Sequence, residues 1–136
     1  MCQSQKELDN KTDNVRTALY LRTSTPNSSS CEYQRQKLLN TLEKHPEWQL
    51  ADTYFDVASS TTPFKKRSGF KTMLNDCKNG KIDLIVTKNI SRFGKNIFGC
   101  MFIVHFLKSL PHPVSVFFDD EKLLINQFKK DGGKEK

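Results

Sequence analysis

Three kinds of pattern are missing from this sequence: a long apolar run, a metal-ligand spacing and a closely spaced cysteine pair. No apolar run approaches the ~18 residues that a membrane span requires, which excludes a membrane-spanning helix. The three histidines share no ligand spacing with each other or with the cysteines, which argues against a zinc site. The four cysteines include no Cys-x-x-Cys pair and no signal peptide precedes them, so we expect reduced thiols in a cytoplasmic protein.

Acidic residues are fewer than basic ones, and the excess positive charge lies in the middle of the chain. The sequence has 22 Lys and Arg against 15 Asp and Glu, a net charge of +7. Residues 1–14 carry two lysines and three acidic residues, and residues 129–136 carry four lysines and two acidic residues, so about +6 of the total belongs to residues 15–128. This charge favours a polyanionic partner such as nucleic acid, but taken alone it fits a solvated basic surface equally well.

The chain has the length of one domain at 136 residues. Residues 1–14 are polar with a single leucine, and we expect a disordered tail there. We expect a second disordered tail over residues 129–136, which leaves residues 15–128 as the folded domain.

Short apolar segments alternate with helical patterns along this domain. The strands are predicted over residues 15–21, 48–57, 82–86 and 114–118. The helices are predicted over three segments: from the capping box of Ser29 and Glu32 to Pro46, over residues 70–77, and from Asn96 to Leu110. This alternation predicts an α/β layered fold with a mainly parallel sheet. Cys77 and Cys100 fall at apolar helical positions and are expected in its core.

The loops after the first three strands carry polar side chains suited to chemistry. Ser24 follows the first strand, Asp56 and Ser59 close the second, and residues 88–92 follow the third. Ligand sites of open parallel sheets lie beyond the carboxyl ends of the strands. We therefore expect these loops to line one edge of the sheet and to form one site.

Ser24 is the candidate nucleophile of this site. A basic set accompanies it in the sequence: Arg22, Arg67, Lys88, Arg92 and Lys95. Arginine offers paired donors that match phosphate oxygens, so an arginine cluster can hold a phosphate and stabilise the charge that develops in phosphoryl transfer. Neither a metal-ligand spacing nor a glycine-rich phosphate loop is visible, so we expect no cofactor.

Five short motifs occur in register between Arg16 and Leu124. They are Tyr20, Leu21, Arg22, Thr23, Ser24 and Thr25, similar to Y-x-R-x-S-T; Ser30, Glu32 and Gln34, similar to S-x-E-x-Q; Tyr54, Asp56, Ser59 and Ser60, similar to Y-x-D-x-x-S-G; Arg67, Gly69 and Phe70, similar to R-x-x-F; and Lys88, Ser91, Arg92, Phe93, Gly94 and Asn96, similar to K-x-x-S-R-F-x-R-N. Together they resemble the catalytic domain of the serine recombinases, the resolvase and invertase family with its large integrase relatives.

The resemblance implies a fold and a reaction. The fold would be a three-layer α/β domain with a central, mostly parallel sheet of four to five strands and helices on both faces. The serine of such a domain attacks a DNA phosphodiester, forms a 5′-phosphoserine link and leaves a free 3′ hydroxyl, which reverses the reaction after strand exchange. No metal or nucleotide is used, and the full-length protein would self-associate as a dimer or tetramer on double-stranded DNA, away from membranes.

The resemblance also implies roles for individual residues. Ser24 would be the nucleophile, and Arg22, Arg67 and Arg92 would bind the scissile phosphate. Gln34 and Asp56 would orient their neighbours, although a cap or loop hydrogen bond explains these two residues equally well. Further phosphate contacts are expected from Lys88, Ser91, Lys95 and Asn96.

The sequence departs from the family pattern at several positions. Pro26, Asn27 and Ser28 stand where a glutamine is often found, Lys95 stands where a second arginine is usual, and Ser60 replaces a glycine. Lysine is a point charge without the planar guanidinium fork, which puts the reaction rate in doubt more than binding. The chain also stops at Lys136, before the long dimerisation helix and DNA-binding module that we expect in full-length relatives.

Two alternatives to an active recombinase domain stay open at this point. A truncated module could keep the fold and bind DNA, or a full-length recombinase, without cutting; Lys95 and the short end favour it, while Ser24 and Arg22 argue against it. A flavodoxin-like phosphate-binding domain would share the layers but predicts none of the motif register.

Overall fold

The computed structural model describes residues 14–25, 28–59, 61–93 and 97–126. Five strands lie in this part of the chain: β2 (Val15–Thr23), β3 (Trp48–Val57), β4 (Leu84–Thr87), β5 (Ser115–Phe118) and β6 (Leu123–Ile125). The helices are α1 (Ser28–Glu43), the 3₁₀ turn η1 (Phe64–Lys66), α2 (Ser68–Lys78), α3 (Ile90–Phe93) and α4 (Ile97–Lys108). None of these helices is both long and apolar enough to cross a membrane.

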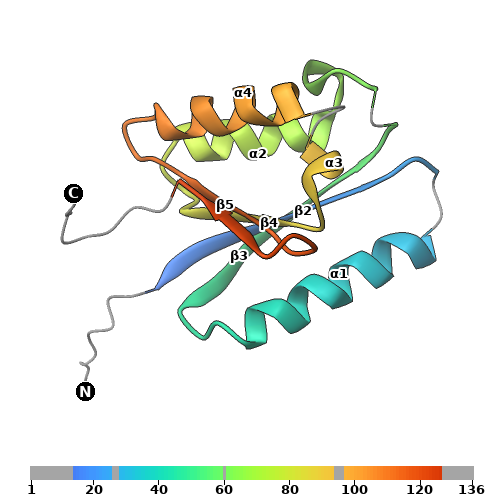
Figure 1. Ribbon diagram of the computed structural model, residues 1–136, viewed down its shortest axis with the longest axis horizontal. Helices are drawn as coiled ribbons and strands as arrows, with labels where there is room; N and C mark the ends of the chain where they lie inside the picture. The colour runs from blue at the N-terminus through green and yellow to red at the C-terminus, as the bar shows by residue number, and fades with distance from the viewer. Residues whose placement is uncertain (1–13, 26–27, 60, 94–96, 127–136) are drawn as a thin grey trace.

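The strands form one sheet in the order β3-β2-β4-β5-β6. The first four are parallel, and β6 pairs antiparallel with β5 at one edge (Figure 1). The carboxyl ends of β2, β3, β4 and β5 therefore point to the same edge of the sheet. This arrangement confirms the predicted α/β fold with a mostly parallel central sheet.

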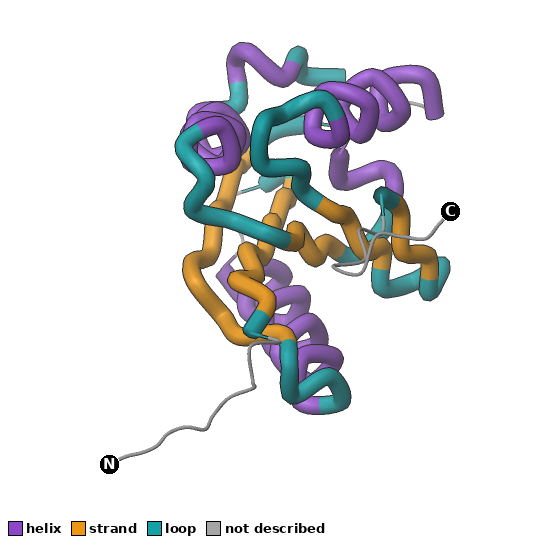
Figure 2. The backbone as a smooth tube through the Cα atoms, turned by 90° about the vertical axis from the view of Figure 1, so that its left-hand side faces the viewer, coloured by secondary structure: helices purple, strands orange, loops and turns teal. Residues whose placement is uncertain are grey.

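The sheet separates two helical layers. Helix α1 covers one face, and α2, α3 and α4 cover the other (Figure 2). Successive residues of β2 alternate between the two cores: Ala18 and Tyr20 pack under α2, α3 and α4, whereas Leu19 and Leu21 pack against α1. This period of two follows from the pleat of a strand, and it explains why the first strand is apolar on both faces. Helices therefore lie on both faces of the sheet, as the three-layer prediction requires, although the edge strand β3 is largely exposed.

Two of the three cysteines in the described helices behave as small apolar core residues, whereas Cys31 of α1 is half-buried. Cys77 of α2 and Cys100 of α4 are buried in the core between these helices and the sheet. Burial raises the pKa of the Cys77 thiol to about 12 and that of Cys100 to about 11. Both therefore stay protonated at neutral pH, which confirms their expected place in the core.

Several boundaries differ from the predicted ones. Strand β2 runs two residues further than predicted, to Thr23, and α1 begins at Ser28 rather than at a Ser29 cap. The sequence pattern missed α3 and β6 entirely, because four and three residues are too few to show a helical or strand period. Helix α2 begins two residues before the predicted range and ends one residue after it, with Asn79 as its C-cap; Gly80 follows with a φ of 74°, a left-handed conformation that glycine adopts readily.

Some predicted features lie outside the described residues. They are the tail over residues 1–13, the tail over 129–136, Ser60, Lys95, Asn96 and the start of the third predicted helix.

Candidate active site

An open cavity of about 440 Å³ lies beyond the carboxyl ends of the parallel strands. The residues that line it are Arg22, Thr23, Ser24, Thr25, Ser30, Ser59, Ser91 and Arg92. They come from the end of β2, the start of α1, the loop after β3 and helix α3. The expected convergence of the three loops on one edge is therefore present, and among the described lining residues the charged ones are Arg22 and Arg92.

Ser24 is the first residue after β2 and is exposed to the cavity. The strand holds it in place because Arg22 and Thr23 pair in register with Asp56 and Val57 of β3. The Thr23 hydroxyl also donates a hydrogen bond to the Thr25 carbonyl, across Ser24. The candidate nucleophile thus directly follows a paired strand and is exposed at the cavity.

Arg22 is buried beside Ser24 with few of its donors in use. Its side chain is only 4% exposed. Its Nη1 donates to the Ala58 carbonyl at 2.8 Å and its Nη2 to the Ser91 carbonyl at 2.9 Å, whereas its buried Nε has no hydrogen-bond partner among the described residues. Burial lowers the pKa of Arg22, and the charges of Arg67 and Arg92 lower it further. An anion placed in the cavity would relieve this repulsion.

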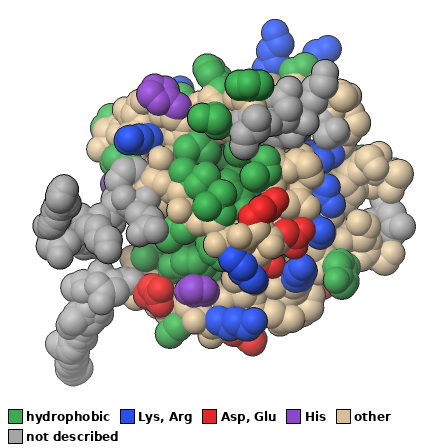
Figure 3. All heavy atoms as spheres, viewed as in Figure 1, with side chains coloured by type: hydrophobic (Ala, Val, Ile, Leu, Met, Phe, Trp, Pro, Cys, Tyr) green, Lys and Arg blue, Asp and Glu red, His purple; other side chains and the backbone are tan. Residues whose placement is uncertain are grey.

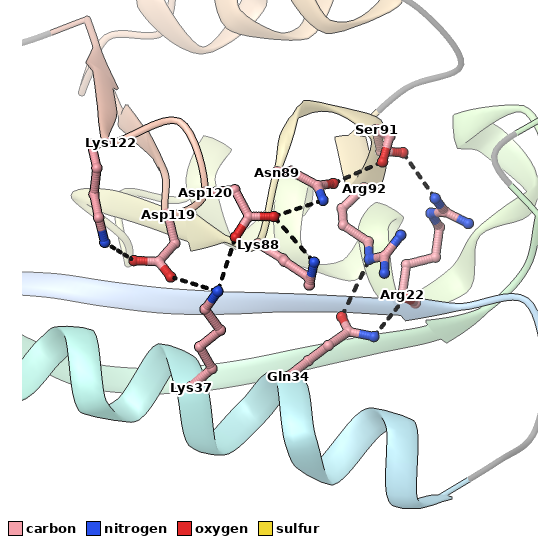
Figure 4. A network of polar contacts seen from close by, with 10 residues as sticks. All are labelled: Arg22, Gln34, Lys37, Lys88, Asn89, Ser91, Arg92, Asp119, Asp120 and Lys122. Atoms are coloured by element: carbon pink, nitrogen blue, oxygen red, sulfur yellow. Dashed lines mark hydrogen bonds and ion pairs between the residues drawn. The ribbon is translucent and has the colours of Figure 1, made fainter.

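Arg92 of α3 lines the same cavity as Arg22. Its Nε donates a long hydrogen bond of 3.4 Å to Gln34 Oε1, and Gln34 Nε2 donates to the Arg22 carbonyl at 3.1 Å (Figure 4). Gln34 is buried on the inner face of α1. It therefore links the strand that carries Arg22 to the arginine of α3 through hydrogen bonds.

Arg67 lies below the cavity and does not line it. Its side chain is 1% exposed and stacks against Phe64, with the guanidinium carbon 5.1 Å from the ring centroid. Its Nη1 donates to the carbonyls of Arg92 and Phe93 at 3.1 and 2.9 Å. They are the carbonyls of the last two residues of α3, and carbonyls at the end of a helix take partners from outside the helix. In this arrangement Arg67 holds the helix that carries Arg92.

Asp56 also supports the site from outside the cavity. Its two carboxylate oxygens accept hydrogen bonds from the backbone N–H groups of Gly69 and Phe70, both at 2.8 Å, and from the Tyr20 hydroxyl at 2.7 Å. The two N–H groups belong to the first turn of α2, so Asp56 caps that helix from a neighbouring strand. A Cβ at Gly69 would lie 2.4 Å from the Phe55 carbonyl oxygen, so only glycine allows this close approach.

Lys88 is paired with a carboxylate rather than turned to the cavity. Its Nζ lies 3.1 Å from Asp120 Oδ2, and the Asn89 amide donates to the same oxygen at 3.1 Å. Lys37 of α1 contacts the other oxygen of Asp120 at 3.0 Å. Burial acts to raise the pKa of Asp120, but the hydrogen bonds from these three donors outweigh it and hold the pKa at about 2.

A second carboxylate completes this network. Asp119 is buried, accepts the Thr41 hydroxyl at 2.6 Å and pairs with Lys122 at 3.1 Å and with Lys37 at 3.9 Å. Acidic and basic side chains lie against one another in the middle of the face shown in Figure 3. We call Lys37, Thr41, Lys88, Asn89, Asp119, Asp120 and Lys122 the lysine network. Sequence reasoning missed its carboxylates, although Asp119 and Asp120 directly follow β5 and obey the same strand-end rule as Ser24.

Ser91 connects the cavity to the lysine network. Its hydroxyl donates to Asn89 Oδ1 at 2.7 Å, and its carbonyl accepts the Arg22 hydrogen bond (Figure 4). Of the ten predicted site residues, four line the cavity: Arg22, Ser24, Ser91 and Arg92. Gln34, Asp56, Arg67 and Lys88 surround it, and Lys95 and Asn96 lie outside the described residues. Within the described part of the chain, no group of three His, Cys, Asp or Glu side chains could hold a metal ion.

Comparisons with known proteins agree with this architecture. The family model described as "Resolvase, N terminal domain" matches residues 17–128. No curated protein sequence is similar enough to count as a match.

Solved structures show the same fold at low sequence identity. The N-terminal catalytic domain of TP901-1 integrase matches with 20% identity over 82% of this chain and 83% of that chain, with a TM-score of 0.72. A resolvase family site-specific recombinase from Streptococcus pneumoniae matches with 20% identity over 85% of this chain and 79% of that chain, with a TM-score of 0.68. The catalytic domain of ISC1926 TnpA, an IS607-like serine recombinase, matches with 17% identity over 77% of this chain and 67% of that chain, with a TM-score of 0.68.

Proposed function

Because this chain belongs to the resolvase family, as a catalytic domain of the serine recombinase type, we propose that it breaks and rejoins DNA strands through Ser24. One observation carries the proposal: Ser24 and two guanidinium groups line the same cavity, and among the described residues no acidic side chain lines it with them. A cavity with this charge favours a phosphodiester over a neutral or cationic ligand.

The reaction is a transesterification. Ser24 Oγ forms a bond to the phosphorus of a DNA phosphodiester as the bond from phosphorus to the 3′ oxygen breaks. The bonding electron pair leaves with the 3′ oxygen, and the proton of the serine hydroxyl ends, in net balance, on the 3′ hydroxyl. The reverse attack by a 3′ hydroxyl reseals the strand, so the phosphodiester energy is conserved in the phosphoserine link and no outside energy source is needed.

The two arginines have different roles in this scheme. Arg22 is anchored on the Ala58 and Ser91 carbonyls and presents its remaining N–H groups from a buried position, so it holds the phosphate beside Ser24. Arg92 is more exposed and is positioned through Nε by Gln34, which leaves its terminal nitrogens for the phosphate oxygens. Charge-assisted contacts of this kind strengthen as negative charge builds up on the oxygens in the transition state. Asp56 and Arg67 act on the reaction by holding Tyr20, α2 and α3 in place.

A substrate with a better leaving group tests the assignment. The chain is incubated with short random-sequence duplexes in which sulfur replaces one bridging 3′ oxygen, because expulsion of the thiol favours the covalent product. After digestion, mass spectrometry identifies the peptide that carries the nucleotide. We expect the link at Ser24 and none in Ser24→Ala. A link at Ser30, Ser59 or Ser91 would overturn the assignment.

The same experiment separates cutting from binding. If the chain binds the duplex but never forms a covalent product, the non-cutting module that keeps the recombinase fold becomes the better description. Self-association on DNA, which family membership implies for full-length relatives, belongs to this proposal as well.

A further inference from the structure

Three donors converge on the carboxylate of Asp120 from two separate elements. Lys37 reaches it from α1 at 3.0 Å, and Lys88 and Asn89 reach it from the turn after β4, both at 3.1 Å. Two ammonium groups and an amide around one anionic group are the donor set of an anion-binding site. Here the anion is supplied by the protein itself.

This internal anion is accessible to solvent. The side chains of Asp120, Lys37 and Lys88 are 31%, 38% and 24% exposed. Ion pairs at such positions contribute little to stability and are screened by salt, so another anion can compete for the lysines. Asp119 behaves differently, because its side chain is 2% exposed and is held by the Thr41 hydroxyl. The Asp119 side chain therefore keeps its position when the Asp120 side chain moves.

The donor set lies next to the cavity of Ser24. Asn89 contacts Asp120 with its amide nitrogen and the Ser91 hydroxyl with its amide oxygen, and Ser91 lines the cavity. Figure 4 shows the continuous path from Lys37 through Asp120 and Asn89 to Arg22. If one phosphate of a DNA strand lies at Arg22 and Arg92, neighbouring phosphates of the same strand would lie near these lysines.

We propose that Lys37, Lys88 and Asn89 form a second phosphate-binding site for the DNA backbone, and that Asp120 occupies it as a competing anion in the free protein. When DNA binds, a phosphate takes the three donors and the Asp120 side chain turns to solvent. The inference rests on the proposed function in taking DNA as the ligand, and it adds a binding site that lies outside the cavity.

Removing the competing charge tests the proposal. Asp120→Asn and Glu121→Gln change the net charge equally, but only Asp120 contacts the lysines; Glu121 is its exposed neighbour. Binding of a labelled random-sequence duplex is measured for both variants and the unchanged chain at ~50 and ~200 mM salt. At the lower salt, we expect Asp120→Asn to bind about fivefold more tightly than the unchanged chain, and Glu121→Gln to differ from it by less than about twofold. The slope of log binding constant against log salt concentration should be steeper by about one unit for Asp120→Asn, as one added phosphate contact requires.

The lysines provide a second measurement. Lys37→Gln should weaken binding at least about threefold more in the Asp120→Asn background than in the unchanged chain, because only there is Lys37 released from the Asp120 carboxylate before DNA binds. Lys71→Gln, an exposed lysine of α2, is the matched control and should act equally in both backgrounds. Asp120→Ser is measured in parallel in case Asp120→Asn does not fold, which circular dichroism reports.

The outcomes separate this inference from the proposed function. If the unchanged chain binds the duplex and Arg92→Gln weakens it, but Asp120→Asn binds no more tightly than Glu121→Gln, the second site is wrong and the proposed function stands. If no variant binds the duplex at either salt, both are overturned.

Discussion

The cavity and the lysine network lie on the same edge of the sheet, but their basic side chains have different kinds of partner. In the cavity, Arg22 and Arg92 contact carbonyls and an amide, and within the described residues neither lies within 4.0 Å of a carboxylate. In the lysine network, three lysines share the carboxylates of Asp119 and Asp120. The difference indicates which region is arranged for an external anion and which region already holds its own.

The comparison also concerns stability. Burial and repulsion from Arg67 and Arg92 lower the pKa of Arg22, so its charged form is disfavoured in the folded protein. Asp120 has its pKa lowered to about 2 by its donors, so its charged form is favoured. Functional sites often keep such unfavourable charges at the expense of stability. Substitutions in the two regions should therefore have different effects on folding and on binding.

The largest expected effect comes from Asp119. Asp119→Ala should lower the free energy of unfolding by about 3 kcal/mol, because the buried Thr41 hydroxyl and the Lys122 ammonium group lose their contact with this carboxylate. Urea unfolding measures this change, and Glu121→Ala, at an exposed neighbour, serves as the control. A loss below about 1 kcal/mol would show that the buried carboxylate is not what holds α1 to the end of β5.

A substitution at Arg92 should affect DNA binding far more than stability, the opposite of the substitution at Asp119. Arg92→Gln is expected to weaken binding of a random-sequence duplex about tenfold at low salt, since one charge-assisted phosphate contact is lost. The free energy of unfolding should stay within about 0.5 kcal/mol or rise, because repulsion with Arg22 is removed. Arg35→Gln, an exposed arginine of α1, carries the same charge change and should leave binding within about twofold. Equal effects of the two substitutions would contradict a special role for the cavity.

The smallest effect is a pH dependence of the lysine network. Because the folded pKa of Asp120 is lowered, to about 2, its contribution to stability is present above the ordinary aspartate pKa and is lost as the pH falls toward 2. The exposure of the pair limits this contribution to less than about 1 kcal/mol. Melting temperatures of the unchanged chain and of Asp120→Asn should differ at pH 6 and converge near pH 2. A difference that persists at pH 2 would mean that the substitution acts through something other than the charge of Asp120.

Much of the fold and the centre of the site could be predicted from local patterns. The four parallel strands are short apolar segments bounded by polar loops, and their predicted limits are within two residues of the observed ones. Since parallel strands place their carboxyl ends together, the meeting of Ser24 with Ser59 and Arg92 followed from the strand assignments alone. Gln34 was expected to orient its neighbours, and it contacts both Arg22 and Arg92.

Other features could not be predicted because they depend on contacts between distant segments. Arg67 and Arg92 were both expected to bind phosphate. In the structure, however, the guanidinium of Arg67 donates hydrogen bonds to the carbonyls at the end of α3. Lys88 was expected to contact phosphate, yet Asp120 lies within 3.1 Å of it. Nothing in the residues around Arg67 or Lys88 indicates which acceptor each will meet.

The sequence by itself determined the alternation of strands and helices, the two-sided burial of β2 and the edge at which Ser24 lies, because apolar spacing and strand direction are local properties of the chain. Only the tertiary structure decided which cations remain available to a ligand. Lys37 and Asp120 are 83 residues apart and Lys88 and Asp120 are 32 apart, so their charges cancel only after α1, β4 and β5 have packed together. Among the described residues, the same packing brings carbonyls and the Gln34 amide to Arg22 and Arg92, so neither arginine forms an ion pair with a carboxylate there.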